Sequence, residues 1–118
     1  MDKRSALRRL AQLRDLEPDW NGYGAKPPRR SAVAAAEQLV HRCGAAPEVF
    51  PTGRRSVQLQ WTRDYGYLEL EVVNATRVEG LFVPGPPDAR CYSDGVEFTT
   101  TVAEAPGVVA RFIDGQGV

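Results

Sequence analysis

Residues 67–72 read YLELEV, and this stretch decides which class of fold the chain adopts. Its leucines and valine alternate with two glutamates, so the apolar side chains share one face of a strand and the carboxylates share the other. The segment VQLQW at residues 57–61 has the same period, and a third apolar run follows at 78–83. Short turns at Arg63-Asp64 and Asn74-Ala75 separate the runs. This pattern predicts half-buried antiparallel strands.

Two helices are predicted before the strands. Leucines recur every third residue near the start of the chain, which predicts a helix over about residues 2–16 that ends before Pro18. A second helix is predicted over residues 32–43 from its alanine-rich apolar face. We expect Ser31 to cap its beginning and Gly44 to end it in a left-handed conformation.

The C-terminal third is less regular. A proline-rich break follows the third apolar run, and a turn at Asp94-Gly95 is expected to join a short strand near Cys91 to a strand over 96–102. Residues 105–113 suit either a short C-terminal helix or a strand. The chain is therefore predicted to be one α+β domain over residues 1–118, with two N-terminal helices packed on one face of an antiparallel sheet, a two-layer sandwich. The expected core comprises Leu7, Leu10, Val33, Leu39, Leu59, Leu68, Leu70 and Phe82.

Composition and charge favour a protein partner over a nucleic acid. The chain has 118 residues, is 42% hydrophobic and 25% charged, and carries no net charge. Residues 1–55 hold 11 basic and 6 acidic side chains, whereas residues 56–118 hold 4 and 9. A dedicated nucleic-acid binder usually carries a positive excess. We expect Glu69, Glu71 and Glu79 to form an acidic strip on the sheet face opposite the helices, free to bind a basic protein.

Residues for catalysis and metal binding are scarce. His41 is the single histidine, and the two cysteines, Cys43 and Cys91, fit no metal-ligand spacing. Cys43 follows His41 by two positions, which places the two side chains on different faces of a helix. We therefore predict no catalytic residue, no metal and no cofactor. The first ten residues, MDKRSALRRL, contain no apolar leader, which favours a cytoplasmic protein with no membrane partner.

The loop WNGYGA at residues 20–25 is the most unusual stretch. In one interpretation Trp20 and Tyr23 pack between the helices and the sheet, while Gly22 and Gly24 adopt positive φ. In the other, the aromatic residues form an exposed patch for a protein partner. The candidate partner-binding residues are Trp20, Asn21, Tyr23, Arg29, Arg30, Glu69, Glu71 and Glu79.

The loop also carries a resemblance. A leucine-rich helix, the WNGYGA loop, Pro27 and an alanine-rich helix are together similar to a family of small uncharacterised bacterial proteins with a W-[ND]-G-Y-G-A-type loop. The likeness covers about residues 5–75 and includes the strand that ends at Trp61. It implies no activity.

Three hypotheses for function remain. The first is a non-enzymatic protein-interaction module, such as an accessory, inhibitor or antitoxin-like factor, which is suggested by the charge split and the aromatic loop. The second is a nucleic-acid-associated factor that uses the basic N-terminal half. The third is a small enzyme with a site assembled around His41, which requires a pocket that contains this histidine and a carboxylate.

Overall fold

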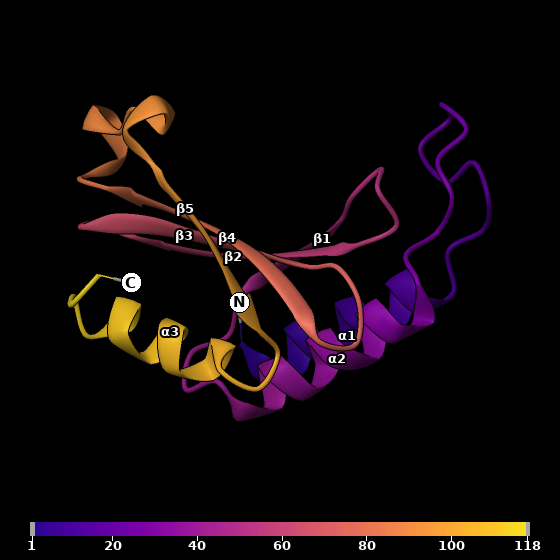
Figure 1. The fold of residues 1–118 in the computed structure, drawn as a ribbon. Helices are drawn as coiled ribbons and strands as arrows, with labels where there is room; N and C mark the ends of the chain where they lie inside the picture. The colour runs from indigo at the N-terminus through magenta and orange to yellow at the C-terminus, as the bar shows by residue number, and fades with distance from the viewer. Residues whose placement is uncertain (1, 118) are drawn as a thin grey trace.

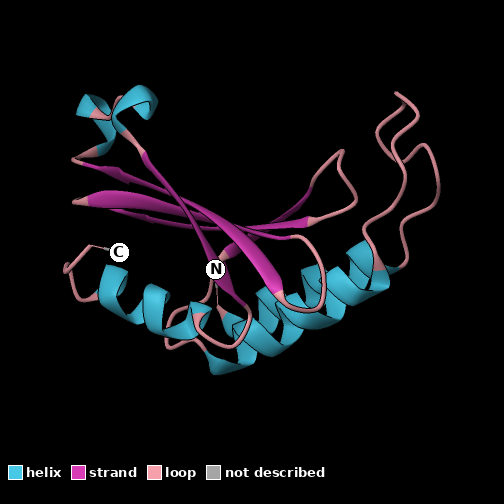
Figure 2. Ribbon diagram, viewed as in Figure 1, coloured by secondary structure: helices cyan, strands magenta, loops and turns pink. Residues whose placement is uncertain are grey.

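The computed structural model describes residues 2–117, which form three α-helices, two short 3-10 helices and a five-stranded antiparallel sheet. The sheet is a meander in which each strand pairs with the next along the chain, in the order β1-β2-β3-β4-β5. Figures 1 and 2 show the three α-helices beneath one face of the sheet; the other face is open except at one end, where the two 3-10 helices lie. The elements are α1 (Lys3–Arg14), α2 (Arg30–Arg42), β1 (Glu48–Pro51), β2 (Val57–Arg63), β3 (Gly66–Val72), β4 (Arg77–Pro84), η1 (Pro87–Ala89), η2 (Tyr92–Asp94), β5 (Val96–Thr101) and α3 (Ala105–Ile113).

The alternation of apolar and polar residues produces this arrangement. Residues 57–63 pair with residues 66–72, so the predicted pairing of the first two runs is confirmed. Leu59 lies opposite Leu70 and Trp61 opposite Leu68. Directly opposed residues in an antiparallel pair point to the same face, so these four side chains meet the helices together.

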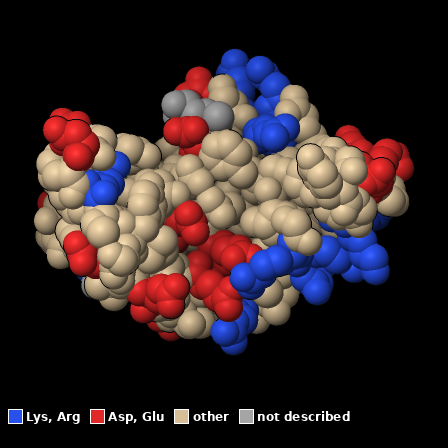
Figure 3. Space-filling model, turned by 90° about the horizontal axis from the view of Figure 1, so that it is seen from above, with Lys and Arg blue, Asp and Glu red and all other residues tan. Residues whose placement is uncertain are grey.

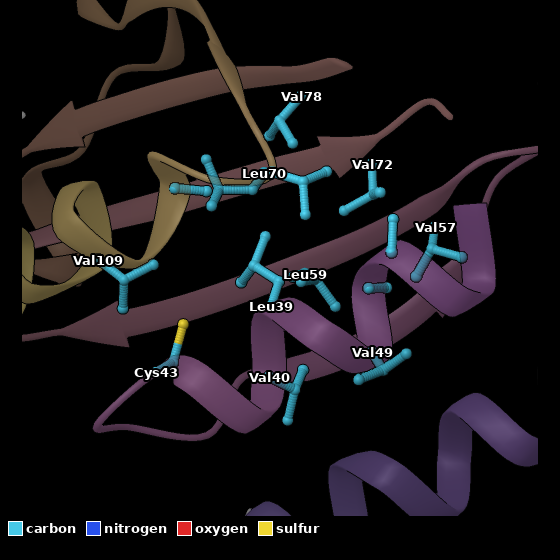
Figure 4. Packing of buried hydrophobic residues seen from close by; sticks show 14 of the residues in the cluster. Leu39, Val40, Cys43, Val49, Val57, Leu59, Leu70, Val72, Val78 and Val109 are labelled. Carbon is cyan, nitrogen blue, oxygen red and sulfur yellow. The ribbon is translucent and has the colours of Figure 1, made fainter. Parts of the chain in front are cut away.

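The core lies between the sheet and the helices (Figure 4). Six of the eight side chains expected there are buried, while Leu7 and Phe82 are partly buried and pack against the others. The Trp61 side chain is 1% exposed, and its indole N–H donates to the carbonyl oxygen of Ala45 at 2.9 Å. Burying an aromatic ring of this size contributes a few kcal/mol, and the hydrogen bond satisfies its one polar atom.

The helix ends differ from the prediction. Helix α1 begins at Lys3, where the Asp2 carboxylate accepts the backbone N–H of Ser5 at 2.7 Å. Helix α2 begins one residue before Ser31, which is therefore not its cap. The N-terminal end of α2 is held instead by Arg29, whose backbone N–H donates to the carbonyl oxygen of Arg55. Gly44 is not left-handed, because the chain leaves the helix in an extended conformation at the preceding residue.

Other differences occur outside the long periodic segments. Strand β1 was not expected, because only Val49 of its four residues is buried and no alternation is visible. The segment around Cys91 forms two 3-10 helices rather than a strand. Residues 105–113 are a helix, so the helical alternative is confirmed. Phe112 is fully buried and meets the ring of Phe82 edge-on at 6.0 Å, which attaches α3 to the sheet.

Candidate protein-binding face

The open face of the sheet carries four glutamates on three neighbouring strands. Glu71 on β3 lies directly opposite Glu79 on β4, and Glu69 and Glu97 both flank Leu81. These four residues line a groove of about 460 Å³. Figure 3 looks down on this face and shows acidic side chains gathered near its middle, with basic side chains along one side. The predicted acidic strip is therefore on the face opposite the helices, and it extends to β5.

Two arginines reduce the charge of the groove. Like charges directly opposite each other destabilise a sheet, so the pair formed by Glu71 and Glu79 needs a cation. Arg54, in the turn between β1 and β2, supplies it: its guanidinium lies 3.4 Å from Glu71 and 3.0 Å from Glu79. Arg77 lies 3.4 Å from Glu79. The acidic strip is therefore accompanied by basic side chains, because the β1–β2 turn brings Arg54 over the sheet.

Glu71 is held more tightly than a surface carboxylate. Its side chain is 15% exposed, and one oxygen accepts both the Arg54 guanidinium and the hydroxyl of Ser56, which is itself buried. Because the single Ser56 proton is donated to this carboxylate, the hydroxyl of Thr52 donates to Ser56 in turn. Glu71 thus fixes the β1–β2 turn, which is a structural role that the alternation alone does not indicate.

Glu69 and Glu97 have no cationic partner within residues 2–117. Glu69 accepts hydrogen bonds from neutral donors, the Tyr67 hydroxyl at 2.8 Å and the Gln58 amide at 3.2 Å. Burial, together with the hydrogen bond to Glu69, raises the pKa of Tyr67 far above its ordinary value, so this donor stays protonated. The side chain of Glu97 accepts no hydrogen bond in the described part of the chain. These two carboxylates are therefore available to an external cation.

Residues 85–95 cover one end of the open face. The ring of Tyr92 meets Tyr67 edge-on at 5.7 Å. The Arg90 guanidinium donates to the carbonyl oxygens of Gly85 and Gly66, each at 2.9 Å, and also to that of Arg63. These bonds tie the segment to the β2–β3 turn. The segment rises above this end of the sheet in Figure 1, and its residues are not among those that line the groove.

The loop between α1 and α2 is closed by its own hydrogen bonds and rises beyond the other end of the sheet (Figure 1). The carboxylate of Asp19 accepts the backbone N–H of Gly24 at 2.6 Å, and the side chain of Asn21 accepts that of Tyr23 at 2.9 Å. Gly22 and Gly24 have φ of 76° and 82°, which confirms that part of the prediction. The acidic and amide residues beside the glycines are the signal for such a self-contained turn.

The two aromatic residues of the loop have different roles. The side chain of Trp20 is partly buried, and its indole N–H donates to the carbonyl oxygen of Lys26 at 2.9 Å. It is not among the residues that form or pack against the core. Tyr23 is 92% exposed. The interpretation in which both rings pack between the helices and the sheet is therefore wrong. The Trp20 indole closes the loop through its hydrogen bond, and the Tyr23 ring points into solvent.

The β1–β2 turn connects the two parts of the candidate site, which are the loop between α1 and α2 and the acidic groove. Arg29 lies at the base of the loop, and its guanidinium donates to the carbonyl oxygen of Arg54 at 3.4 Å. Arg54 reaches the groove from the same turn. The adjacent Arg30 is exposed at the first position of α2. The contribution of Arg54 was missed because its partners Glu71 and Glu79 are distant in sequence.

The basic residues of the helices do not gather in one patch. Helices α1 and α2 run antiparallel, since Lys3 donates to the carbonyl oxygen of His41 while Arg14 lies 3.7 Å from Glu37. Basic residues at the start of α1 therefore lie at the opposite end of the helix pair from Arg30. This separation disfavours a continuous phosphate-binding surface.

The enzyme hypothesis requires a pocket that contains His41. This residue is exposed and lines neither the acidic groove nor a second groove beside β5. That part of the chain contains no group of three or more histidine, cysteine or carboxylate side chains placed to hold a metal ion. Its helices are all too short or too polar to cross a membrane. Burial raises the pKa of the Cys43 thiol to about 11, whereas a hydrogen bond from Ser93 lowers that of the exposed Cys91.

Neither a protein-family model nor a curated protein nor a solved structure matches the chain. The resemblance of residues 5–75 to small bacterial proteins with a W-[ND]-G-Y-G-A-type loop stays a prediction.

Proposed function

We propose that this protein is a non-enzymatic interaction module that binds a basic segment of another protein on the open face of its sheet. The observation that carries this proposal is the groove of about 460 Å³, in which Glu69 and Glu97 have no cationic partner within the described residues. Arg54 and Arg77 balance the charge of Glu71 and Glu79, so the negative charge that remains in the groove is that of Glu69 and Glu97.

The chemistry of the groove favours arginine or lysine side chains as ligands. A guanidinium that bridges the half-buried Glu69 and the exposed Glu97 replaces water around both carboxylates and forms charge-assisted hydrogen bonds. Arg54 already binds two glutamates of this face in that manner. The exposed ring of Tyr23, on a loop closed by its own hydrogen bonds, supplies an aromatic contact at the end of the sheet.

Titration with an arginine-rich peptide tests the proposal. Binding to the whole protein is measured by fluorescence anisotropy, and we expect it to weaken as salt increases. The double variant Glu69→Gln, Glu97→Gln should weaken binding at least about tenfold, since each lost charge-assisted contact contributes on the order of 1 kcal/mol. The double variant Glu104→Gln, Asp114→Asn is the matched control, because it removes the same two charges from the ends of α3, away from the open face.

Equal affinity for the Glu69→Gln, Glu97→Gln variant and the control would refute the proposal, as would the absence of measurable binding at low salt. Far-UV circular dichroism of each variant checks that the fold is retained.

A further inference from the structure

The two edges of the sheet differ in how they are protected. Edge strand β1 has four residues, ends in Pro51 and packs against α1. Because the backbone N–H of Thr52 donates to the carbonyl oxygen of Ser56, the N–H groups in register with that bond point toward β2. Only Val49 can offer both an N–H and a carbonyl to a further strand, since Pro51 has no N–H. Strand β1 is therefore protected against pairing with a further strand.

Edge strand β5 has none of these protections. Its six residues, VEFTTT, include no proline and no lysine, and they are β-branched or aromatic apart from one glutamate. The backbone N–H of Val102 donates to the carbonyl oxygen of Thr76 at 2.9 Å, which sets the phase of the ladder with β4. The outward residues are therefore Glu97, Thr99 and Thr101. Within residues 2–117, the N–H groups of these three residues have no hydrogen-bond acceptor.

A partly apolar groove runs beside this edge. It measures about 220 Å³ and is lined by Val96, Phe98 and Val108, together with Thr99, Thr100 and Arg111. The side chain of Val96 is 54% exposed, although it lies on the face of β5 that is turned toward the core. An added strand would both pair the free backbone groups and cover this groove.

We infer that β5 is a strand-addition surface and that its occupant is the β5 strand of a second copy of this chain, paired antiparallel. The strand is complementary to itself when Thr99 lies on the twofold axis. In that register the outward residues form three reciprocal pairs, with about four inter-strand hydrogen bonds to free carbonyl oxygens and two more to the Thr101 carbonyl oxygens, which already accept the N–H of Glu104. Glu97 of each copy faces Thr101 of the other, and the two Glu97 residues lie about 13 Å apart, so like charges do not oppose each other.

The same register also pairs the helix-side residues. Phe98 of one copy lies beside Thr100 of the other, and Val96 lies beside Val102, so each copy closes the partly apolar groove of its partner. The twofold axis is perpendicular to the sheet, because residues of the same face are opposed. The product is a continuous ten-stranded sheet with both acidic faces on one side. This inference is independent of the proposed function, since it rests on β5 and not on binding to the groove.

Sedimentation equilibrium over a broad range of concentration tests the inference on the whole protein. We expect a monomer–dimer equilibrium. Thr99→Pro should raise the dimer dissociation constant at least about tenfold, because it removes the two central hydrogen bonds while leaving the bonds to β4 intact.

Two variants of opposite charge at position 101 test the register of the two β5 strands. They also test the inference if the Thr99→Pro variant fails to fold. Thr101→Lys places a cation opposite Glu97 of the second copy and should tighten the dimer, whereas Thr101→Glu should weaken it. Within one chain residue 101 lies opposite Arg77, so these substitutions shift monomer stability in the opposite order. A monomer at all concentrations overturns the inference, as does an unchanged dimer in Thr99→Pro or the same dimer affinity in both Thr101 variants. Addition of an unrelated extended peptide to a monomeric chain also overturns the choice of occupant.

Discussion

Gly80→Ala is expected to destabilise the protein through Phe98 alone. Gly80 on β4 lies directly opposite Phe98 on β5, and the phenyl ring lies over the glycine on the helix side of the sheet. A Cβ at position 80 would fall well inside contact distance of three atoms of the ring. The ring must therefore swing off the sheet, which we expect to cost about 1–3 kcal/mol, the range for overpacking of a well-packed site.

The same substitution in a Phe98→Ala protein shows whether the Phe98 ring causes the destabilisation. Phe98→Ala removes the ring, and position 80 then has room for a methyl group. In that background Gly80→Ala should stabilise the protein by about 0.5–1 kcal/mol, because alanine loses less conformational freedom on folding than glycine. The substitution should thus change sign between backgrounds, with a coupling energy of about 2 kcal/mol or more.

Urea unfolding of the four proteins measures these free energies. One low protein concentration is used throughout, so that association does not contribute, and coincident fluorescence and circular dichroism transitions check two-state behaviour. The reasoning is wrong if Gly80→Ala costs the same free energy with and without the ring.

Three further predictions concern titratable side chains. Stability should fall as pH rises above about 9, by up to about 1.4 kcal/mol per pH unit, because the Cys43 thiol ionises in the unfolded chain before it does in the folded one; Cys43→Ala should remove the slope between about pH 9 and 10 in urea titrations, above which Tyr67, whose pKa is also raised, adds a slope of the same sign. Ellman's reagent should label Cys91 rapidly in the folded protein and Cys43 only on unfolding, since the former is exposed with a lowered pKa and the latter is buried; rapid labelling of both thiols would contradict the fold. Glu71→Gln should cost about 1–2 kcal/mol in thermal unfolding, because it weakens the bonds that hold the β1–β2 turn, whereas Glu97→Gln should change stability by less than about 0.5 kcal/mol; equal effects would show that the turn is held by other contacts.

The long strands could be predicted because each of their residues faces either the helices or solvent. The period of two in residues 57–61 and 67–72 therefore predicts both that these residues form strands and which face of each strand is buried. Strand β1 could not be found in this way, since a four-residue edge strand with one buried side chain has no visible period. Residues 105–113 stayed open because their valines favour a strand and Pro106 favours a first helical turn. Burial of Phe112 against the sheet decides for the helix.

The candidate site was predictable only where it follows the strand period. Glu69, Glu71 and Glu79 were assigned to the correct face by alternation. The difference in burial between Glu71 and a surface carboxylate depends on Ser56 and Arg54, which reach it only after the β1–β2 turn has formed. Tyr23 illustrates the opposite limit: the glycines beside it predict a tight turn, but a turn can point an aromatic ring inward or outward with equal ease.

Arg90 gives one end of the molecule a stability of its own. Residues 85–95 contain no strand, and the Arg90 guanidinium donates to one carbonyl oxygen of the segment, that of Gly85, and to two that flank the β2–β3 turn, those of Arg63 and Gly66. A strand in a ladder separates from its neighbour one hydrogen bond at a time, whereas this segment is released in a single event when the cation leaves. Amide hydrogen exchange near Tyr92 should therefore follow the free energy of that one local opening, while amides at the centre of β3 exchange only through global unfolding. An exchange pattern of this kind would divide the fold into two units that open separately, with a side chain rather than a linker at their boundary.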